Sequence, residues 1–228
     1  MSKRIIAIAI SAMISVSFMG CGAKKDINNG EKNIKTATEI KYDELDGKWA
    51  KDLLLDELKD KYVELLELVE EKTEGYGLEY SKDEIMTEND GETVNDNHIY
   101  LDNENPEKNR LESLYFGMKT YGDNISSGQI TMKLSLNFDG KGALKNNDFD
   151  FAQTSLAAYS ALFTGETDRD FSSINSQIVD ILKSESQEGV ISDSIDGLYE
   201  EFTVNKEYIV YKLETKKYDF KAAADARK

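Results

Sequence analysis

The sequence predicts an α+β fold: an antiparallel sheet covered by helices on one face, with a long N-terminal amphipathic helix. Two segments, 111–121 and 129–138, alternate apolar and polar side chains with the period of two that marks a half-buried strand. A third segment, 45–69, spaces its apolar residues three and four positions apart, as a helix does. Because the strand alternation is one-sided, it favours an antiparallel sheet with one face packed on helices.

The expected N-terminal helix carries a continuous apolar stripe. Its members are Leu45, Trp49, Leu53, Leu58, Tyr62, Leu65, Leu66 and Val69. Lysine and glutamate occupy the opposite face, with Glu57 and Lys61 at helical spacing, and Gly75 and Gly77 end the pattern. We expect the stripe to pack on the domain's own sheet, because it lasts only about three heptads; a coiled-coil partner is the alternative.

The remaining elements are shorter. They are strands 77–80 and 98–102 around an acidic loop at 88–97, helices 149–163 and 171–181, and strands 198–204 and 208–213. Gly165 ends the first of these helices, and Asp168 or Asp170 caps the start of the second. Asn205 and Lys206 form the turn between the last two strands, and the charged tail from residue 216 onward is expected to fray.

The first twenty residues are typical of an export signal. Lys3 and Arg4 form a basic start, and an apolar run from Ile5 to Met19 follows. The run is about 15 residues long, shorter than the roughly 20 that cross a hydrocarbon core, which argues against a membrane-spanning helix. Cys21 is the only cysteine of the chain and has no disulfide partner, which argues against an ordinary signal peptide with an Ala-x-Ala cleavage site.

The motif Phe18-Met19-Gly20-Cys21 resembles the lipobox of bacterial lipoproteins, with the small Gly20 directly before the cysteine. The resemblance covers only the leader and implies nothing about the mature domain. It implies that Cys21 becomes the first mature residue and carries a thioether-linked diacylglycerol, with or without an amide-linked chain such as palmitate. Two acyl chains, at ~0.8 kcal/mol per buried methylene, anchor a protein stably. The expected location is the extracytoplasmic face of a Gram-positive-type bacterial cell membrane.

The charge balance limits the classes of partner. The chain has 28 basic and 44 acidic residues, a net charge of −16, and loss of Lys3 and Arg4 with the leader makes the mature part more acidic still. Such a surface disfavours nucleic acid and is repelled by anionic lipid headgroups, so we expect the membrane contact to depend on the lipid at Cys21. Without a disulfide, the mature domain must be stabilised by its own core, for which its length suffices.

These observations divide the chain into four parts. They are a signal peptide at 1–20, a flexible tether at 21–41, a single α+β domain at 42–218 and a charged tail at 219–228. The tether is polar, without a period, and has Asn28, Asn29 and Gly30 at its centre.

Catalytic chemistry finds little support in the residues present. His98 is the only histidine, so Ser-His-Asp, Cys-His and zinc chemistry are disfavoured, and a hydrogen-bonded or exposed histidine is expected. The spacing of Glu166, Asp168 and Asp170 is similar to the start of a calcium loop. However, Phe171 stands where that loop needs glycine and Gln177 where it needs glutamate, so helix capping is favoured.

Two further features of the sequence bear on ligand binding. Gly140-Lys141-Gly142 predicts a hairpin or loop and lacks the spacing of a phosphate loop. Tyrosines on the non-core faces of strands are the other candidates for binding: Tyr115, Tyr121, Tyr199 and Tyr211. Exposed rings on a sheet can stack on a sugar or contact a protein, but packing under helices or across strands is the favoured expectation.

The sequence therefore favours a membrane-anchored extracytoplasmic lipoprotein that acts as a non-enzymatic binding or accessory module, with an envelope protein or glycan as partner. No catalytic residue, cofactor or metal site is predicted. Because carboxylates are abundant, a carboxylate-based hydrolase of envelope polymers is the alternative, recognisable by a cleft with two carboxyls about 5–10 Å apart. A solute-binding lipoprotein is the third hypothesis, and it fits less well because the chain is short and shows no parallel βαβ pattern.

Overall fold

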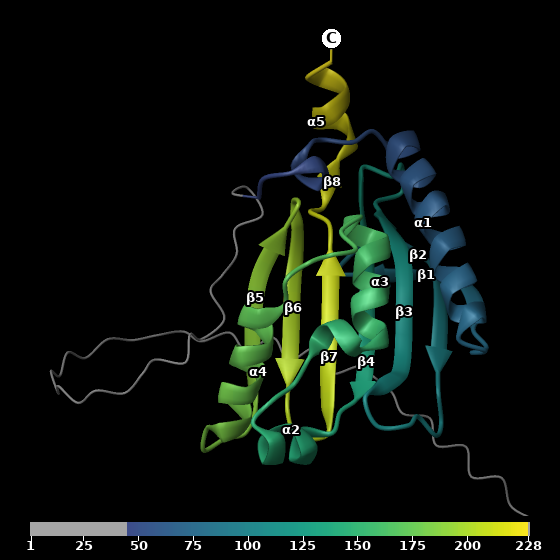
Figure 1. Cartoon of the computed structure of the whole chain (residues 1–228). Helices are drawn as coiled ribbons and strands as arrows, with labels where there is room; N and C mark the ends of the chain where they lie inside the picture. The colour runs from purple at the N-terminus through teal and green to yellow at the C-terminus, as the bar shows by residue number, and fades with distance from the viewer. Residues whose placement is uncertain (1–44, 228) are drawn as a thin grey trace, which may run out of the picture. The chain divides into compact units, whose positions relative to one another are not determined.

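The computed structural model describes residues 45–227, which form one antiparallel sheet with helices (Figure 1). The eight strands are β1 (Ser81–Asn89), β2 (Glu92–Asp102), β3 (Arg110–Tyr121), β4 (Ser127–Asn137), β5 (Gly189–Ile195), β6 (Leu198–Val204), β7 (Tyr208–Glu214) and β8 (Tyr218–Asp219). The helices are α1 (Leu55–Gly75), α2 (Gly140–Asn146), α3 (Ser155–Thr164), α4 (Ser172–Lys183) and α5 (Phe220–Asp225), with two short 3-10 helices, η2 (Lys48–Ala50) and η3 (Phe151–Gln153). The predicted α+β class with an antiparallel sheet is confirmed.

The first four strands form a meander, and the second half of the sheet joins it at β4. Seven strands lie in the order β1-β2-β3-β4-β7-β6-β5, and the short β8 also pairs with β4. Every pairing is antiparallel. The chain reaches β5 only after passing through α2, η3, α3 and α4, so β4 and β7 pair although about 80 residues separate them.

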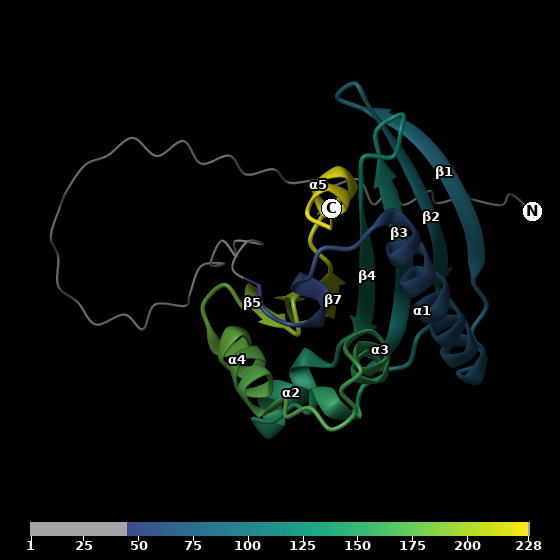
Figure 2. The ribbon, with the colours of Figure 1, turned by 90° about the horizontal axis from the view of Figure 1, so that it is seen from above.

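The helices α1, α3 and α4 lie over the same face of the sheet (Figure 2). Contacts join α1 to β3 and β4, α3 to β3 and β7, and α4 to β5 and β6. The strand residues beneath them are fully buried, as Phe116, Leu134 and Phe202 illustrate. Burial of one such side chain contributes about 1.5–3 kcal/mol, so this layer supplies most of the stability of the domain.

The segment before α1 does not continue that helix. Residues 48–50 form η2, whose Trp49 N–H donates to the Asp196 carbonyl at 3.1 Å, and α1 itself spans Leu55–Gly75. The indole ring of Trp49 packs edge-on against Phe163 of α3, with centroids 5.3 Å apart. The apolar spacing of this stretch therefore reflects two separate elements that use the same core.

Three local predictions were wrong, and one strand was not predicted. Residues 88–97 are not a loop, because β1 and β2 form a long hairpin around the two-residue turn Asp90–Gly91, and the expected strand at 77–80 lies instead at β1. Residues 140–142 begin α2 rather than a hairpin, since the Asp139 carboxylate accepts the Gly142 N–H at 3.2 Å. The strand β5 was missed altogether.

The tail from residue 216 onward does not fray over its described part. Tyr218, Phe220 and Ala223 are buried, and the Tyr218 hydroxyl donates to the Trp49 carbonyl at 2.7 Å. The Arg227 guanidinium makes two 2.8 Å contacts with the Glu57 carboxylate of α1. The alanine-rich composition thus belongs to α5, a docked helix at one end of the sheet (Figure 1).

Candidate functional site

The second face of the sheet carries polar and aromatic side chains. No described helix between residues 45 and 227 lies over it (Figure 2). We call it the open face and define it by the strand positions Asp96, His98, Tyr115, Gly117, Lys119, Tyr121, Thr131, Lys133, Tyr199, Glu201, Lys212 and Glu214. Pairing across the sheet fixes this set, because directly opposite residues of an antiparallel pair point to the same side.

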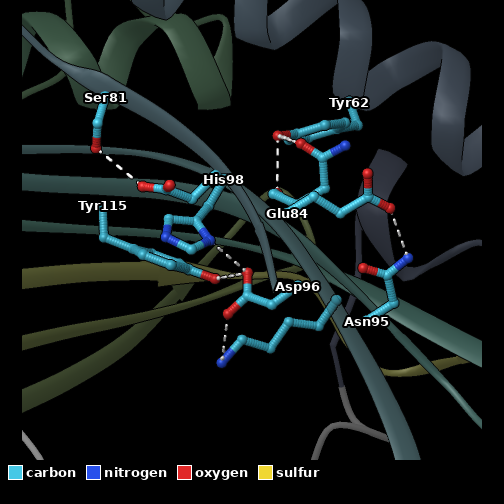
Figure 3. Close-up of polar contacts among 10 residues, drawn as sticks. Tyr62, Ser81, Glu84, Asn95, Asp96, His98 and Tyr115 are labelled. Atoms are coloured by element: carbon cyan, nitrogen blue, oxygen red, sulfur yellow. Dashed lines mark hydrogen bonds and ion pairs between the residues drawn. The ribbon is translucent and has the colours of Figure 1, made fainter. Parts of the chain in front are cut away.

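Asp96 is the centre of a polar cluster on this face (Figure 3). Its Oδ1 accepts the Tyr115 hydroxyl at 2.7 Å and lies 3.1 Å from Nδ1 of His98. Its Oδ2 lies 3.4 Å from the Lys119 ammonium. The His98 and Tyr115 rings are tilted against one another with centroids 5.0 Å apart. The cluster therefore uses both oxygens of one carboxylate to fix three side chains from two neighbouring strands.

Gly117 makes room for this arrangement. A Cβ atom at this position would lie 2.6 Å from the Tyr115 hydroxyl oxygen and 2.7 Å from the His98 Cβ. The Tyr115 ring can therefore lean along β3 across Gly117 and reach Asp96, which pairs with Lys119 rather than with Tyr115. The glycine is required here by the close approach of a side chain.

The open-face tyrosines act as neutral hydrogen-bond donors. Burial, followed by the nearby Asp96 charge, raises the pKa of Tyr115 well above its usual value. Burial and the Glu214 charge raise the pKa of Tyr121 to about 12, and burial with the Glu201 hydrogen bond raises the pKa of Tyr199 to about 12. These hydroxyls therefore stay protonated across the physiological range and do not serve as nucleophiles there.

Each of these three tyrosine rings has a lysine ammonium above it. The distances from Nζ to the ring centroid are 5.7 Å for Lys119 on Tyr115, 5.2 Å for Lys212 on Tyr199 and 3.7 Å for Lys217 on Tyr121. Such cation–π contacts contribute about 0.5–1 kcal/mol at exposed sites. The rings thus hold cationic groups in place, and one face of each ring is covered by a lysine of the same chain.

Lys133 adds a further positive charge at the centre of the open face. It is exposed on β4, opposite Tyr115 on one side and Lys212 on the other. The Lys212 ammonium contacts Glu214 at 3.0 Å. Two like charges directly opposite one another in a sheet are unfavourable in the isolated chain. Glu201 lies opposite Lys212 on its other side, so Lys133 is the lysine of this pair whose charge has no carboxylate directly across the sheet.

The four predicted tyrosines do not share one environment. Tyr115, Tyr121 and Tyr199 lie on the open face, half-buried against their cross-strand neighbours. Tyr211 does not lie on the non-core face: it has the opposite parity on β7 and is completely buried under the helices, in agreement with the favoured expectation of packing. Its neighbour Lys212 takes the open-face position instead, because a shift of one residue reverses the side of a strand.

Tyr211 belongs to a buried ionic cluster that the sequence did not reveal. Glu200 occupies a core-facing position of β6 and is fully buried. The Arg169 guanidinium contacts both of its carboxylate oxygens, at 2.5 and 2.6 Å, and the Tyr211 hydroxyl donates to it at 2.6 Å. Ser160 of α3 contacts that hydroxyl at 2.8 Å. Arg169 thus joins the connection between α3 and α4 to the sheet. The one sequence feature that could have indicated the cluster is Glu200, which shares its side of β6 with apolar residues.

His98 is buried, and its contact with Asp96 agrees with the expectation of a hydrogen-bonded histidine. Asp83 of β1 lies directly opposite it in register, and the Ser81 hydroxyl donates to Asp83 at 3.0 Å (Figure 3). The serine therefore contacts a carboxylate in this arrangement rather than the imidazole.

The acidic residues considered for calcium serve the start of α4. Asp170 Oδ1 accepts the Ser172 N–H at 2.8 Å, and this bond lowers the pKa of Asp170. The N-cap prediction for Asp168 or Asp170 is wrong, because Phe171 occupies the N-cap position, but the Asp170 carboxylate still accepts the first N–H of the helix. Over residues 45–227, no three or more His, Cys, Asp and Glu side chains form a group that could hold a metal ion.

A cavity of about 350 Å³ lies between the start of β3, α2 and η3. Three aspartates line it, Asp139, Asp148 and Asp150. Two of them are engaged at helix starts: Asp139 accepts the Gly142 N–H at 3.2 Å, and Asp150 accepts the Ala152 N–H at 3.0 Å. The cavity is separate from the open-face cluster and shares no residue with it.

The predicted signal peptide at 1–20, the lipidation residue Cys21 and the whole tether at 21–41 lie outside the described residues. Among the helices that are described, none is both long and apolar enough to cross a membrane. Comparison with known proteins gives no match to this chain: no family model, no curated protein and no solved structure is similar to it.

Proposed function

We propose that this chain is a lipid-anchored, extracytoplasmic accessory lipoprotein that binds an envelope protein through the open face of its sheet. The observation that carries the binding role is the set of three lysine-covered tyrosines around Lys133, on a face without a helix over it in the described chain. The anchor rests on the lipobox-like motif that ends at Cys21.

A protein partner is favoured over a glycan by the state of the tyrosine rings. Stacking on a sugar needs a free ring face, and a lysine ammonium lies over one face of each of Tyr115, Tyr121 and Tyr199. The exposed Lys133 presents an ammonium group at the centre of the open face, which suits a carboxylate-bearing surface. The preferred partner is therefore a protein with an acidic patch, complementary to the centre of the open face.

The binding role is tested by charge reversal with a matched control. Lys133→Glu inverts the exposed charge at the centre of the open face, and Lys59→Glu makes the same change on α1, which packs on the opposite face. Full-length chains carrying each change are cross-linked in intact cells and recovered. The captured envelope protein is expected with the wild type and Lys59→Glu, and lost with Lys133→Glu. Equal capture by both variants contradicts the proposal.

The anchor is tested separately. Cys21→Ala is expected to move the chain from the detergent phase to the aqueous phase, or to leave the leader uncleaved, because the acyl chains can no longer attach. Unchanged detergent partitioning of Cys21→Ala would refute the lipoprotein assignment.

A carboxylate-based hydrolase of envelope polymers is the second candidate, favoured by the cavity with three aspartates. Asp148 is exposed and does not cap the start of a helix, as Asp139 and Asp150 do, so it is the residue to test. Wall-polymer hydrolysis by the purified chain that disappears in Asp148→Asn, without capture of any envelope protein, would replace the binding proposal.

A further inference from the structure

The outer edge of β1 is an unpaired strand edge with unusual features. β1 is nine residues long, pairs only with β2 among the described strands, and exposes every residue. Ile85 and Met86 at its centre are 48% and 71% exposed. The strand has no proline and no register shift against β2. Edge strands of this length are ready templates for another strand, and proteins commonly shorten, bend or cover them.

The hairpin turn determines which backbone groups face outward. Asp90 and Gly91 have φ values of 51° and 78°, which mark a type I′ turn, so Asn89 and Glu92 form a hydrogen-bonded pair. Such pairs alternate along an antiparallel ladder. The odd-numbered residues of β1 therefore bond to β2. The even-numbered ones, Lys82, Glu84, Met86 and Glu88, direct their N–H and C=O groups to the free edge.

The charges on this edge favour one self-pairing register. In a two-fold symmetric antiparallel pair, a residue must lie opposite itself at the axis, because opposite residues point to the same side of the sheet. An axis at Glu84 places that carboxylate against its own copy, and an axis at Met86 places Glu84 against Glu88. An axis at Asp83 pairs Lys82 with Glu84 but places Asp83 against its own copy. An axis at Ile85 places Lys82 of each copy against Glu88 of the other, giving two attractive pairs and no like-charged pair.

We propose that two copies of this chain form a dimer through antiparallel pairing of their β1 edges about an axis at Ile85. The two sheets then become one continuous sheet. In this register Ile85 meets Ile85 of the second copy in a non-hydrogen-bonded pair, where side chains approach most closely. The exposed apolar side chain becomes covered, and Glu84 lies opposite Met86 rather than opposite another carboxylate. The charges of β1 thus specify one register among the symmetric alternatives that centre on this edge.

The first test uses charge swapping in the full chain, with sedimentation velocity in density-matched detergent. Wild type is expected to dimerise reversibly with concentration. Lys82→Glu and Glu88→Lys each turn two attractive cross-strand pairs into two repulsive ones, so each should weaken the dimer about tenfold or more. The double variant Lys82→Glu/Glu88→Lys restores attraction between the copies and should dimerise more tightly than either single variant, although it loses the contact of Lys82 with Glu70 of α1. A double variant no better than the single ones contradicts the register.

The second test uses backbone chemistry and cross-linking. Met86→Pro removes an outward-facing N–H and leaves the β1–β2 ladder intact, so it should abolish the dimer without a change in circular dichroism. Ile85→Cys should form an intermolecular disulfide, since a non-hydrogen-bonded pair has a Cα separation of about 4.5 Å. Met86→Cys should cross-link no more than wild type, whose only thiol position is Cys21. A monomeric wild-type chain at all concentrations, or equal cross-linking of the two cysteine variants, overturns the proposal.

Discussion

The two Asp-Gly turns of the sheet provide a matched pair for measuring a backbone contact. Asp90–Gly91 joins β1 to β2, and Asp196–Gly197 joins β5 to β6. The conformations are nearly identical, with φ of 51° and 78° in the first turn and 50° and 83° in the second. Alanine at either glycine position must therefore adopt a left-handed conformation, at a cost of about 1–2 kcal/mol.

The surroundings of the two turns differ. A Cβ atom on Gly91 would have nothing within 4 Å, whereas one on Gly197 would lie 2.3 Å from the Ala50 nitrogen and 2.9 Å from the Trp49 carbonyl carbon. These are backbone atoms of η2, which cannot rotate away. Relief of the clash costs about 1–3 kcal/mol as overpacking. It also weakens the hydrogen bond from Trp49 to Asp196, worth about 1 kcal/mol.

We therefore expect Gly91→Ala to lower the free energy of unfolding by about 1–2 kcal/mol and Gly197→Ala by about 3–5 kcal/mol. Urea unfolding of the full chain, followed by circular dichroism and by the single tryptophan, measures both values. The comparison removes the conformational cost, because both variants bear it. Equal destabilisation within about 0.5 kcal/mol, the usual reach of a surface change, would refute the assignment of a close backbone contact between the second turn and η2.

Three other outcomes follow from the structure. Arg169→Met should destabilise the chain by about 3–5 kcal/mol in urea, because it leaves the Glu200 carboxylate buried without its cation, whereas Arg169→Met/Glu200→Leu should recover most of the loss. The hydrogen bond from Arg227 and that from the backbone lower the pKa of Glu57 to about 2. The stabilisation is therefore complete above the ordinary carboxyl pKa and is lost as pH falls toward 2, so the melting-temperature gap between wild type and Arg227→Gln should shrink over that window and not at neutral pH. Gly117→Ala should displace the tyrosine ring that covers it, which would shift the NMR signals of the only imidazole in the chain; unchanged signals would contradict the packing.

The hairpins show how local signals compete in sequence interpretation. Asp90–Gly91 and Asp196–Gly197 are both strong hairpin dipeptides, and each correctly marks a turn between paired strands. The acidic composition of 88–97 favours a loop, whereas Asp90–Gly91 favours a hairpin. The observed pairing of β1 with β2 follows the dipeptide. Composition reports solvent exposure, and β1 is indeed exposed along its whole length, but exposure does not exclude strand pairing.

Part of the candidate site could be predicted from the sequence. Alternation along β3 placed Tyr115 and Tyr121 on the non-core face, because that parity is a property of one strand alone. Lys119 lies on the same strand as Tyr115, but Lys212 comes from β7 and Lys217 from the tail, so no local pattern could pair these two with Tyr199 and Tyr121. The side taken by Tyr211 is a similar case: on a short strand of mixed residues, only the register with β4 decides the side.

What the sequence alone determined was local: the α+β class, the sides of β3 and β4, and the helix end at Gly165, all of which depend on residues within one or two turns. It is also the sole basis for the anchor predicted at Cys21. The tertiary structure decided the pairing of β4 with β7, the burial of Glu200 and the docking of the tail through Arg227. These contacts join segments far apart in the chain. Such contacts form only when the burial of a common apolar core outweighs the entropy lost in closing the intervening chain. A pattern of neighbouring residues carries no information about that free-energy difference.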